Sequence, residues 1–152
     1  MRTLAIPNFR LLTRLIAVVN LALYRLTGGR VGGRFGRIRI LLLTTKGRRS
    51  GKRRTQPLLY IEDGAALAVV ASNWGNRRYP AWYLNLQADP RATVQLRSRR
   101  RRVTAAIASA QDRARLWPRL LDAYPGYARY EERTAGLRDI PIVLLAPRKR
   151  ED

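Results

Sequence analysis

The residues best suited to bind a ligand are six cations within nine consecutive positions, between two apolar runs. The six are Lys46, Arg48, Arg49, Lys52, Arg53 and Arg54. Gly47 and Gly51 interrupt them, and glycine lets a backbone adopt positive φ and approach a ligand closely. Because arginine binds phosphate oxygens through two parallel hydrogen bonds, the stretch predicts a hairpin that holds an anion, most simply a phosphate. The alternative is a solvated basic turn on a surface hairpin.

Glycine spacing excludes two common nucleotide-binding motifs. A P-loop requires two glycines separated by four residues, followed by Lys-Ser/Thr and a helix. Here three residues separate Gly47 from Gly51, and Arg53 follows Lys52. The glycines within residues 28–36 never give the G-x-G-x-x-G spacing, and they precede a predicted strand instead of following one. We interpret this glycine-rich stretch as a flexible linker.

The composition limits the chemistry that the chain can perform without a cofactor. It contains no histidine and no cysteine, which excludes Ser-His-Asp and Cys-His catalysis, disulfides and histidine-containing metal sites. Only ten acidic residues are present, so we expect no metal site. An enzyme of this composition therefore depends on an organic cofactor. The net charge of +21 predicts an anionic partner: nucleic acid, acidic lipid headgroups or a small polyanionic cofactor.

The length of 152 residues predicts one domain, and an amphipathic helix precedes its strands. Apolar residues at helical spacing predict this helix over residues 11–26. Its longest uncharged run, residues 15–24, is too short for a membrane span, which needs about 20 residues. The helix either covers the open end of a sheet or contacts an anionic membrane peripherally through residues 8–27. We expect a cytoplasmic protein, in the second case on the inner face of the plasma membrane.

Six short apolar or alternating stretches predict strands. They cover residues 38–45, 55–62, 65–72, 92–97, 102–109 and 140–146. Asp63-Gly64 marks a tight turn, so the first three strands are expected to be consecutive and antiparallel. A second basic cluster, Arg97 with residues 99–102, falls at the tip of another hairpin, where we interpret it as solvated.

Helices are predicted between these strands. Pro80 suits the first turn of one helix. A capping box from Ser109 to Asp112 opens another, which Pro118 should kink. Together the pattern predicts a mixed α+β protein built on a small barrel. The regions are an N-terminal helix and linker over residues 1–37, the barrel over 38–147 and a charged tail over 148–152.

Several of these segments resemble the deazaflavin-dependent nitroreductase family in order and spacing. They are residues 44–58, 70–73, 80–86, 89–91, 116–127 and 140–141. Gly-Arg-Arg-Ser-Gly in the first segment and Pro-Ala-Trp-Tyr-Leu-Asn-Leu in the third are specific in combination, whereas either alone is weak. The resemblance covers about residues 40–147 and matches the N-terminal forty residues only weakly.

The resemblance implies a split β-barrel of the FMN-binding-like type, with about six mostly antiparallel strands and flanking helices. It implies coenzyme F420, a deazaflavin whose tail carries a phosphodiester and carboxylates. The implied enzyme is an F420H2-dependent oxidoreductase that transfers hydride to an electron-poor acceptor, such as a quinone, an enone or a nitroaromatic compound. Two alternatives stay open: an FMN-binding oxidoreductase of the same fold, and a basic nucleic-acid-binding barrel. We expect no specific nucleic-acid partner, and a monomer or homodimer.

Matched position by position, the resemblance implies that Arg49 and Arg54 hold the cofactor's phosphate. Residues expected along the tail are Lys46, Arg48, Ser50 and Gly51. Residues expected around the deazaflavin ring are Pro57, Leu58 and Leu59 on one side, Ala71, Ser72 and Asn73 on the other, and Asn85 in the same site. Arg49 stands where the family often has lysine, which should preserve anion binding.

The resemblance also implies that Tyr124, Tyr127 and Tyr130 face the substrate pocket. A hydroxyl of Tyr127, Tyr130 or Ser72 is then expected to donate a hydrogen bond or proton to the charge that develops on the acceptor. Trp74 stands where small residues are usual in the family, so we expect it to alter the shape of the substrate pocket. The alternative for the tyrosines is core packing.

Overall fold

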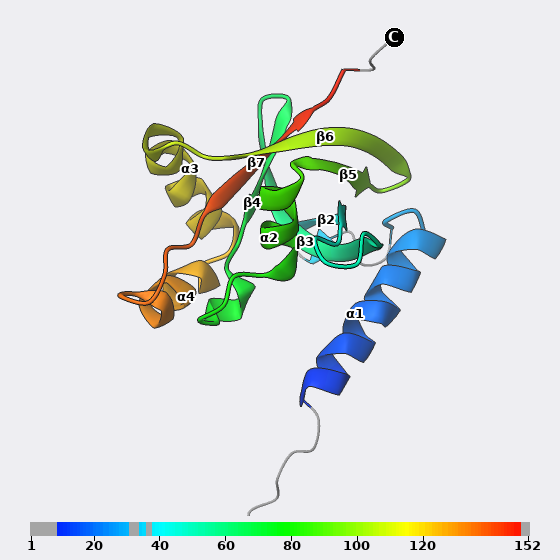
Figure 1. Ribbon diagram of the computed structural model, residues 1–152, viewed down its shortest axis with the longest axis horizontal. Helices are drawn as coiled ribbons and strands as arrows, with labels where there is room; N and C mark the ends of the chain where they lie inside the picture. Colours follow the sequence, from blue (N-terminus) through cyan, green and yellow to red (C-terminus); the bar gives the residue numbers. More distant parts are fainter. Residues whose placement is uncertain (1–8, 31–33, 36–37, 150–152) are drawn as a thin grey trace, which may run out of the picture.

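Strand β2 is the strand at which the sheet closes into a barrel. The computed structural model describes residues 9–30, 34–35 and 38–149. Its elements are α1 (Phe9–Leu26), β1 (Arg34–Phe35), β2 (Ile38–Lys46), β3 (Arg53–Asp63), β4 (Ala66–Val70), η1 (Asn73–Gly75), α2 (Ala81–Ala88), β5 (Arg91–Leu96), β6 (Arg99–Ile107), α3 (Ala110–Ala123), α4 (Gly126–Thr134) and β7 (Ile142–Pro147). The sheet order is β1-β2-β3-β4-β7-β6-β5, and β2 also pairs with β5 (Figure 1). Strands β2 to β7 therefore form a closed antiparallel barrel, which confirms the predicted split-barrel class.

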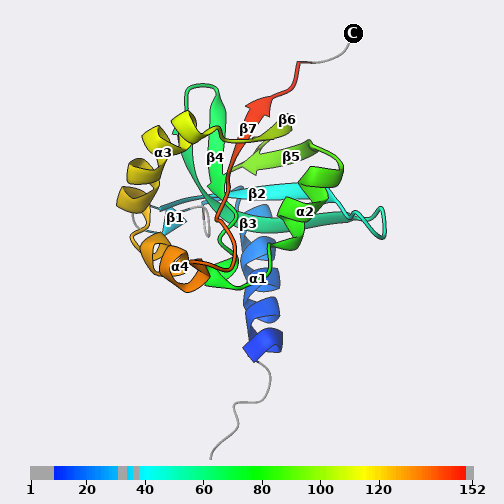
Figure 2. The same cartoon turned by 60° about the vertical axis from the view of Figure 1, so that its left-hand side comes forward.

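Apolar residues at alternating positions fill the barrel. Leu41 and Leu43 of β2 and Val94 of β5 are fully buried there. Helix α2 contributes Trp82 and Leu86 to the same core, and it lies beside the barrel near β2 and β5 (Figure 2). All six predicted strands are present, with ends that differ by a few residues.

Strand β3 separates two cores because its successive side chains point to opposite faces. Leu58 packs against the barrel core. Leu59 and Ile61 pack instead in a second core under α3 and α4, around Leu116 and Leu120. The outer face of β3 and these two helices therefore enclose the second core.

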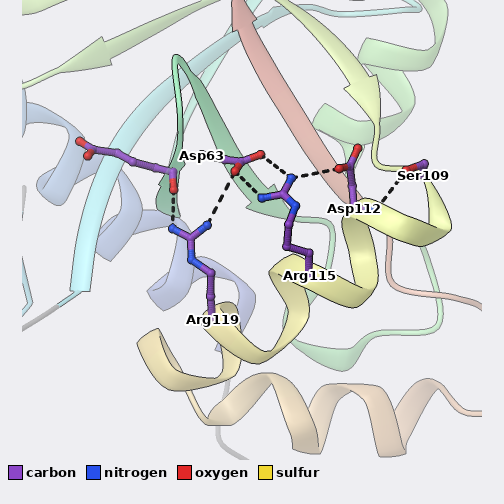
Figure 3. Close-up of polar contacts among 6 residues, drawn as sticks. Asp63, Ser109, Asp112, Arg115 and Arg119 are labelled. Atoms are coloured by element: carbon purple, nitrogen blue, oxygen red, sulfur yellow. Dashed lines mark hydrogen bonds and ion pairs between the residues drawn. The ribbon is translucent and has the colours of Figure 1, made fainter.

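The predicted N-cap at Ser109 is confirmed at the start of α3, since its hydroxyl accepts a hydrogen bond from the Asp112 amide at 3.1 Å, whereas the Asp112 carboxylate binds Arg115 instead of completing a capping box. Arg115 joins the same helix to the β3–β4 turn, donating to both carboxylate oxygens of Asp63 at 2.6 and 3.0 Å (Figure 3). Arg119 donates to the Glu62 carbonyl at 2.7 Å. Helix α3 is therefore fixed at its N-terminus and along one side. The helix continues through Pro118, the residue at which a kink was predicted.

We expect the contact between Asp63 and α3 to make stability depend on pH. Hydrogen bonding from Arg115 holds the pKa of Asp63 below its ordinary value of 3.8. The stabilisation is therefore complete above about pH 4 and is lost as pH falls through the lowered pKa. Asp63→Asn should reduce the unfolding free energy by roughly 0.5–1 kcal/mol at neutral pH, and the difference should be smaller at pH 2.

Urea unfolding at both pH values tests this prediction. Glu62→Gln is the matched control, since Glu62 is 60% exposed and its carboxylate pairs with Arg39 on the surface. An Asp63→Asn deficit that persists unchanged in acid would contradict the assignment.

The described part of the glycine-rich stretch packs on the barrel, and its interpretation as a flexible linker stays a prediction. Gly29 is buried, its amide donates to the Tyr24 carbonyl at 2.8 Å, and its φ is +77°. A Cβ at this position would lie 2.6 Å from the Arg97 Cα, so only glycine fits. Strand β1 follows within the same stretch; residues 31–33 and 36–37 lie outside the described parts.

Helix α1 is attached to the barrel at its C-terminal end and then extends away from it (Figure 1). The Tyr24 hydroxyl accepts from the Arg97 amide at 2.7 Å and lies 3.2 Å from the Ile40 and Gln95 carbonyls. Among residues 18–26, Tyr24 is the buried one, so this part of the helix does not cover the sheet. Within the described residues, no helix is both long and apolar enough to cross a membrane.

Candidate functional site

The basic residues lie on the tight turn that joins β2 to β3. The Gly47 amide donates to the Lys52 carbonyl, and the Gly51 amide donates to the Gly47 carbonyl, both at 2.8 Å. Gly51 has a φ of +69°, and a Cβ at Gly47 would lie 2.8 Å from the Ser50 Oγ. The backbone conformation of the turn therefore favours glycine at position 51, and a side chain at position 47 would have to displace the Ser50 hydroxyl. The predicted hairpin is confirmed.

The six cations of this turn are exposed, and in the described part of the chain none of them pairs with a carboxylate. Other arginines of the protein, such as Arg91 and Arg115, do have carboxylate partners. The turn therefore presents a concentrated positive charge whose hydrogen-bond donors face solvent, as an anion-binding site requires.

Asn85 of α2 supports the turn from the barrel side. Its side chain is buried, with 4% of its surface exposed. Its Oδ1 accepts from the Arg48 amide at 3.1 Å, and its Nδ2 donates to the Thr45 Oγ1 at 3.1 Å. Asn85, which the resemblance assigns to the cofactor site, thus lies next to the basic turn, and both ends of its amide fix the turn: one binds a backbone amide and the other the Thr45 hydroxyl.

An aromatic cleft lies at the other end of β3, between that strand and the helices α3 and α4. Its volume is about 240 Å³, and its lining includes Leu59, Tyr124 and Tyr127. The hydroxyls of Tyr124 and Tyr130 are hydrogen-bonded at 3.0 Å. The three predicted substrate tyrosines therefore form one cluster, together with Leu59 of the predicted ring site.

Burial controls the acidity of this cluster. It raises the pKa of Tyr130 to about 12, with help from the hydrogen bond to Tyr124. Burial also raises the pKa of Tyr127, which is 4% exposed, and the neighbouring tyrosines add to the effect. Both hydroxyls therefore keep their protons at neutral pH and can act as hydrogen-bond donors.

The loop formed by residues 71–76 packs against α4 and brings Trp74 next to Tyr130. The Trp74 ring meets Tyr130 edge to face, with centroids 6.3 Å apart, and 77% of its side chain is exposed. Asn73 donates from its side chain to the Arg78 carbonyl at 2.9 Å, so its amide stabilises the loop itself. Ser72 is half-buried directly before η1.

Two of the residues predicted to contact the ring have side chains that point into the barrel core. Ala71 is fully buried in the barrel core, and Leu58 packs against the same core. Because adjacent strand residues alternate, Leu58 and Leu59 point to opposite faces of β3. Of these three residues, only Leu59 directs its side chain toward the aromatic cleft; Pro57 shares its face of the strand.

One residue at the site was missed by the sequence analysis. Arg138 follows α4 and binds the carbonyls of Ala71, Ser72 and Asn76 from outside the loop. A single arginine between a helix and a strand gives no local signal of this role, since its partners are more than sixty residues away in sequence.

Strand β3 connects the two halves of the site. From Arg54 to Leu59 it rises about 17 Å, at about 3.3 Å per residue; by strand alternation Arg53 shares the face of Leu59, whereas Arg54 lies on the opposite face at the open end of the strand. Unpaired cations at one end suit phosphate and carboxylate groups, and the cleft at the other end, where tyrosine and leucine side chains lie beside Arg39, Glu62 and Arg119, offers aromatic faces to a planar ring. This set of residues fits an elongated cofactor that has a ring and an anionic tail.

A closed antiparallel barrel with such a two-part site defines the class of flavin- and deazaflavin-binding oxidoreductases. The family model described as F420H(2)-dependent quinone reductase matches residues 17–147, and the chain belongs to that family. The protein is therefore an F420-dependent oxidoreductase, in agreement with the expected cofactor. The matched family is named for quinone reduction rather than for nitro reduction.

Relatives and solved structures agree with this assignment. The chain is 40% identical over 131 residues to the F420H(2)-dependent quinone reductase Rv1261c of Mycobacterium tuberculosis, covering 84% of this chain and 87% of the relative. It is 45% identical over 108 residues to Rv3178 of the same organism, covering 71% and 89%. A solved structure described as the F420-H2 dependent reductase FDR-A superposes with a TM-score of 0.63 at 36% identity, covering 70% of this chain and 92% of that chain.

Proposed function

We propose that the chain uses F420H2 to reduce quinones to hydroquinones. The observation that carries the proposal is the arrangement along β3. Cations without carboxylate partners among the described residues lie at one end. At the other end Tyr124, whose hydroxyl is hydrogen-bonded to that of Tyr130, lines the cleft together with Leu59. The match to the quinone reductase family supports a quinone over an enone or a nitroaromatic acceptor.

In this proposal Arg49 and Arg54 hold the cofactor's phosphate. The tail is lined by Lys46, Arg48, Ser50 and Gly51, and Asn85 fixes the backbone of the turn. Leu59, Pro57, Ser72 and Asn73 surround the ring, with Leu58 and Ala71 contributing backbone only.

When bound, F420H2 supplies a hydride. The quinone takes up this hydride and one proton, which gives a hydroquinone. Tyr130, whose hydroxyl is bonded to that of Tyr124, donates a hydrogen bond or proton to the quinone oxygen on which negative charge develops. Tyr127 and Ser72 are the other candidate donors, and Trp74 forms one wall of the acceptor site.

The experiment that tests this function measures oxidation of F420H2 by menadione, with reduced FMN offered in parallel. We expect turnover with the deazaflavin and little with FMN. Oligonucleotides titrated at several salt concentrations should bind weakly, without sequence preference, and with steep salt sensitivity. Sequence-selective binding near physiological salt, with no turnover, would favour the nucleic-acid-binding alternative.

We also propose that α1 contacts an anionic membrane. Its exposed apolar residues include Val18, Val19, Leu23 and Leu26, which are 61, 49, 38 and 84% exposed. Arg25 lies among them, and the exposed arginines of the β5–β6 hairpin begin at Arg97, which contacts Tyr24 of the helix. Apolar side chains next to arginines suit a surface of anionic headgroups.

Vesicle binding tests the membrane proposal. Val19→Asn combined with Leu26→Asn should lower affinity for phosphatidylglycerol vesicles at least about 100-fold, because about 1.5–3 kcal/mol is gained per buried large apolar side chain and two such side chains are lost. Leu137→Asn is the matched control, since Leu137 is 54% exposed but lies after α4. Equal binding of the vesicles by the wild type, the double variant and Leu137→Asn would contradict the proposal.

A further inference from the structure

The η1 turn holds three successive residues at positive φ. The values are 44° at Asn73, 57° at Trp74 and 72° at Gly75. Glycine adopts this conformation freely, but a residue with a β-carbon does so at a cost, and a bulky one is a true outlier. An exposed tryptophan in this conformation therefore requires support from the structure around it.

Arg138 supplies that support from the segment between α4 and β7. Its guanidinium donates to the carbonyls of Ala71 at 3.1 Å, Ser72 at 2.8 Å and Asn76 at 2.9 Å. It also donates to the carbonyl of its neighbour Asp139 at 2.8 Å. One planar fork therefore binds the loop on both sides of the residues at positive φ.

Two further contacts fix Arg138 itself. Its guanidinium carbon lies 4.8 Å from the centroid of the Tyr79 ring, within cation–π range. The Tyr79 hydroxyl donates to the Asp139 carboxylate. The arginine is therefore held between an aromatic face and the carbonyls that it binds.

Helix α4 closes on the opposite side of the turn. A Cβ added at Gly75 would lie 3.2 Å from the Tyr130 Cα, so the backbones of the turn and the helix approach closely. Arg133 of the helix reaches the Trp74 carbonyl at 3.5 Å. The turn is thus fixed between Arg138 and the helix that carries Tyr130.

We propose that Arg138 is a positioning residue that holds residues 71–76 so that Trp74 and Tyr130 together receive a flat quinone. The identity of the acceptor rests on the proposed function, whereas the role of Arg138 in the loop does not. Lysine cannot replace it, because a single ammonium group cannot reproduce a planar fork that binds several separated carbonyls.

The test compares Arg138→Gln and Arg138→Lys with the wild type. Hydrogen exchange is followed at the amides of Gly75 and Asn76, which bond to the carbonyls of Ser72 and Asn73 at 2.9 Å each. Binding of menadione is followed through the indole N–H resonance of Trp74, assigned with Trp74→Phe, and needs no turnover. Steady-state turnover of menadione completes the set.

We expect exchange at Gly75 and Asn76 to be at least about tenfold faster in both variants, as loss of hydrogen bonds to a charged group implies. The Gly51 amide of the basic turn should exchange at the wild-type rate. Menadione should bind about tenfold more weakly, with KM raised by a similar factor and kcat changed much less, because binding rather than transition-state stabilisation is lost.

Arg113→Gln is the matched control. Arg113 donates to the Ile140 carbonyl and pairs with Glu131, close to Arg138, without binding residues 71–76. Arg113→Gln should lower the free energy of unfolding of the whole protein. Relative to other amides, those of Gly75 and Asn76 should exchange no faster than in the wild type.

Unchanged exchange in the Arg138 variants would overturn the inference, and so would full rescue by lysine. Faster exchange with unaltered menadione binding would overturn it as well. If the wild-type protein oxidises no F420H2, the proposed function fails, and the exchange and binding measurements still decide the role of Arg138.

Discussion

Tyr130→Phe should lower the turnover of menadione by F420H2 about 10²-fold, the lower range for general acid catalysis, while cofactor affinity stays near wild type. The substitution keeps the ring against Trp74 and removes only the hydroxyl, which is bonded to Tyr124 at 3.0 Å. Because burial raises the pKa of Tyr130 to about 12, the hydroxyl stays protonated far above neutral pH. Loss of its proton should therefore cause no fall in rate between about pH 6 and 10.

Tyr127→Phe and the double variant separate catalysis from packing. Tyr127 is 4% exposed, so loss of its hydroxyl should cost about 1 kcal/mol of stability and reduce turnover less than Tyr130→Phe. Tyr24→Phe is the control, since that hydroxyl bonds to the Arg97 amide at the attachment of α1. Wild-type turnover in all the Tyr127 and Tyr130 variants would assign both residues to core packing alone.

Arg54→Ala should weaken F420 binding roughly 10- to 150-fold, which corresponds to about 1.5–3 kcal/mol for a hydrogen bond to a charged group. Arg54 is exposed where the basic turn enters β3, paired in register with Thr45, whose hydroxyl binds Asn85. The phosphate is therefore expected next to a backbone that is already fixed. Equilibrium titration of the purified protein with F420 measures the change.

Arg101→Ala is the matched control for this prediction. Arg101 is equally exposed, but it belongs to the β5–β6 hairpin and pairs with Val94. Its loss removes the same charge from another part of the barrel. Equal losses in both variants would mean that net charge alone attracts the cofactor, and unchanged affinity in Arg54→Ala with an intact fold would contradict the phosphate assignment.

The features that sequence predicted well depend on local patterns. The alternation along β2 and β3, the glycines of the basic turn and the cap at Ser109 each act within a few residues. The same patterns could not assign faces around the site, since Leu58 and Leu59 are both apolar and only their packing partners, the barrel core for Leu58 and helices α3 and α4 for Leu59, distinguish them.

The features that sequence missed depend on contacts between distant segments. Arg138 acts on carbonyls that any residue type would supply, so the partner residues leave no trace in composition. Asn85 was assigned to the site by resemblance, but its role in fixing the Arg48 amide required the packing of α2 on the barrel. The positive φ of Trp74 likewise depends on α4 and Arg138, since nothing in the local sequence favours it.

The double pairing of β2 has a kinetic consequence. Its contacts with β3 close a short hairpin, which forms in about 1–10 μs in isolated peptides, whereas its contacts with β5 join segments about fifty residues apart. Long-range pairing is slow because the entropy of the intervening chain must be lost first. The basic hairpin should therefore form early in folding, whereas the contacts by which Asn85 fixes its turn form only after α2 has packed on the barrel.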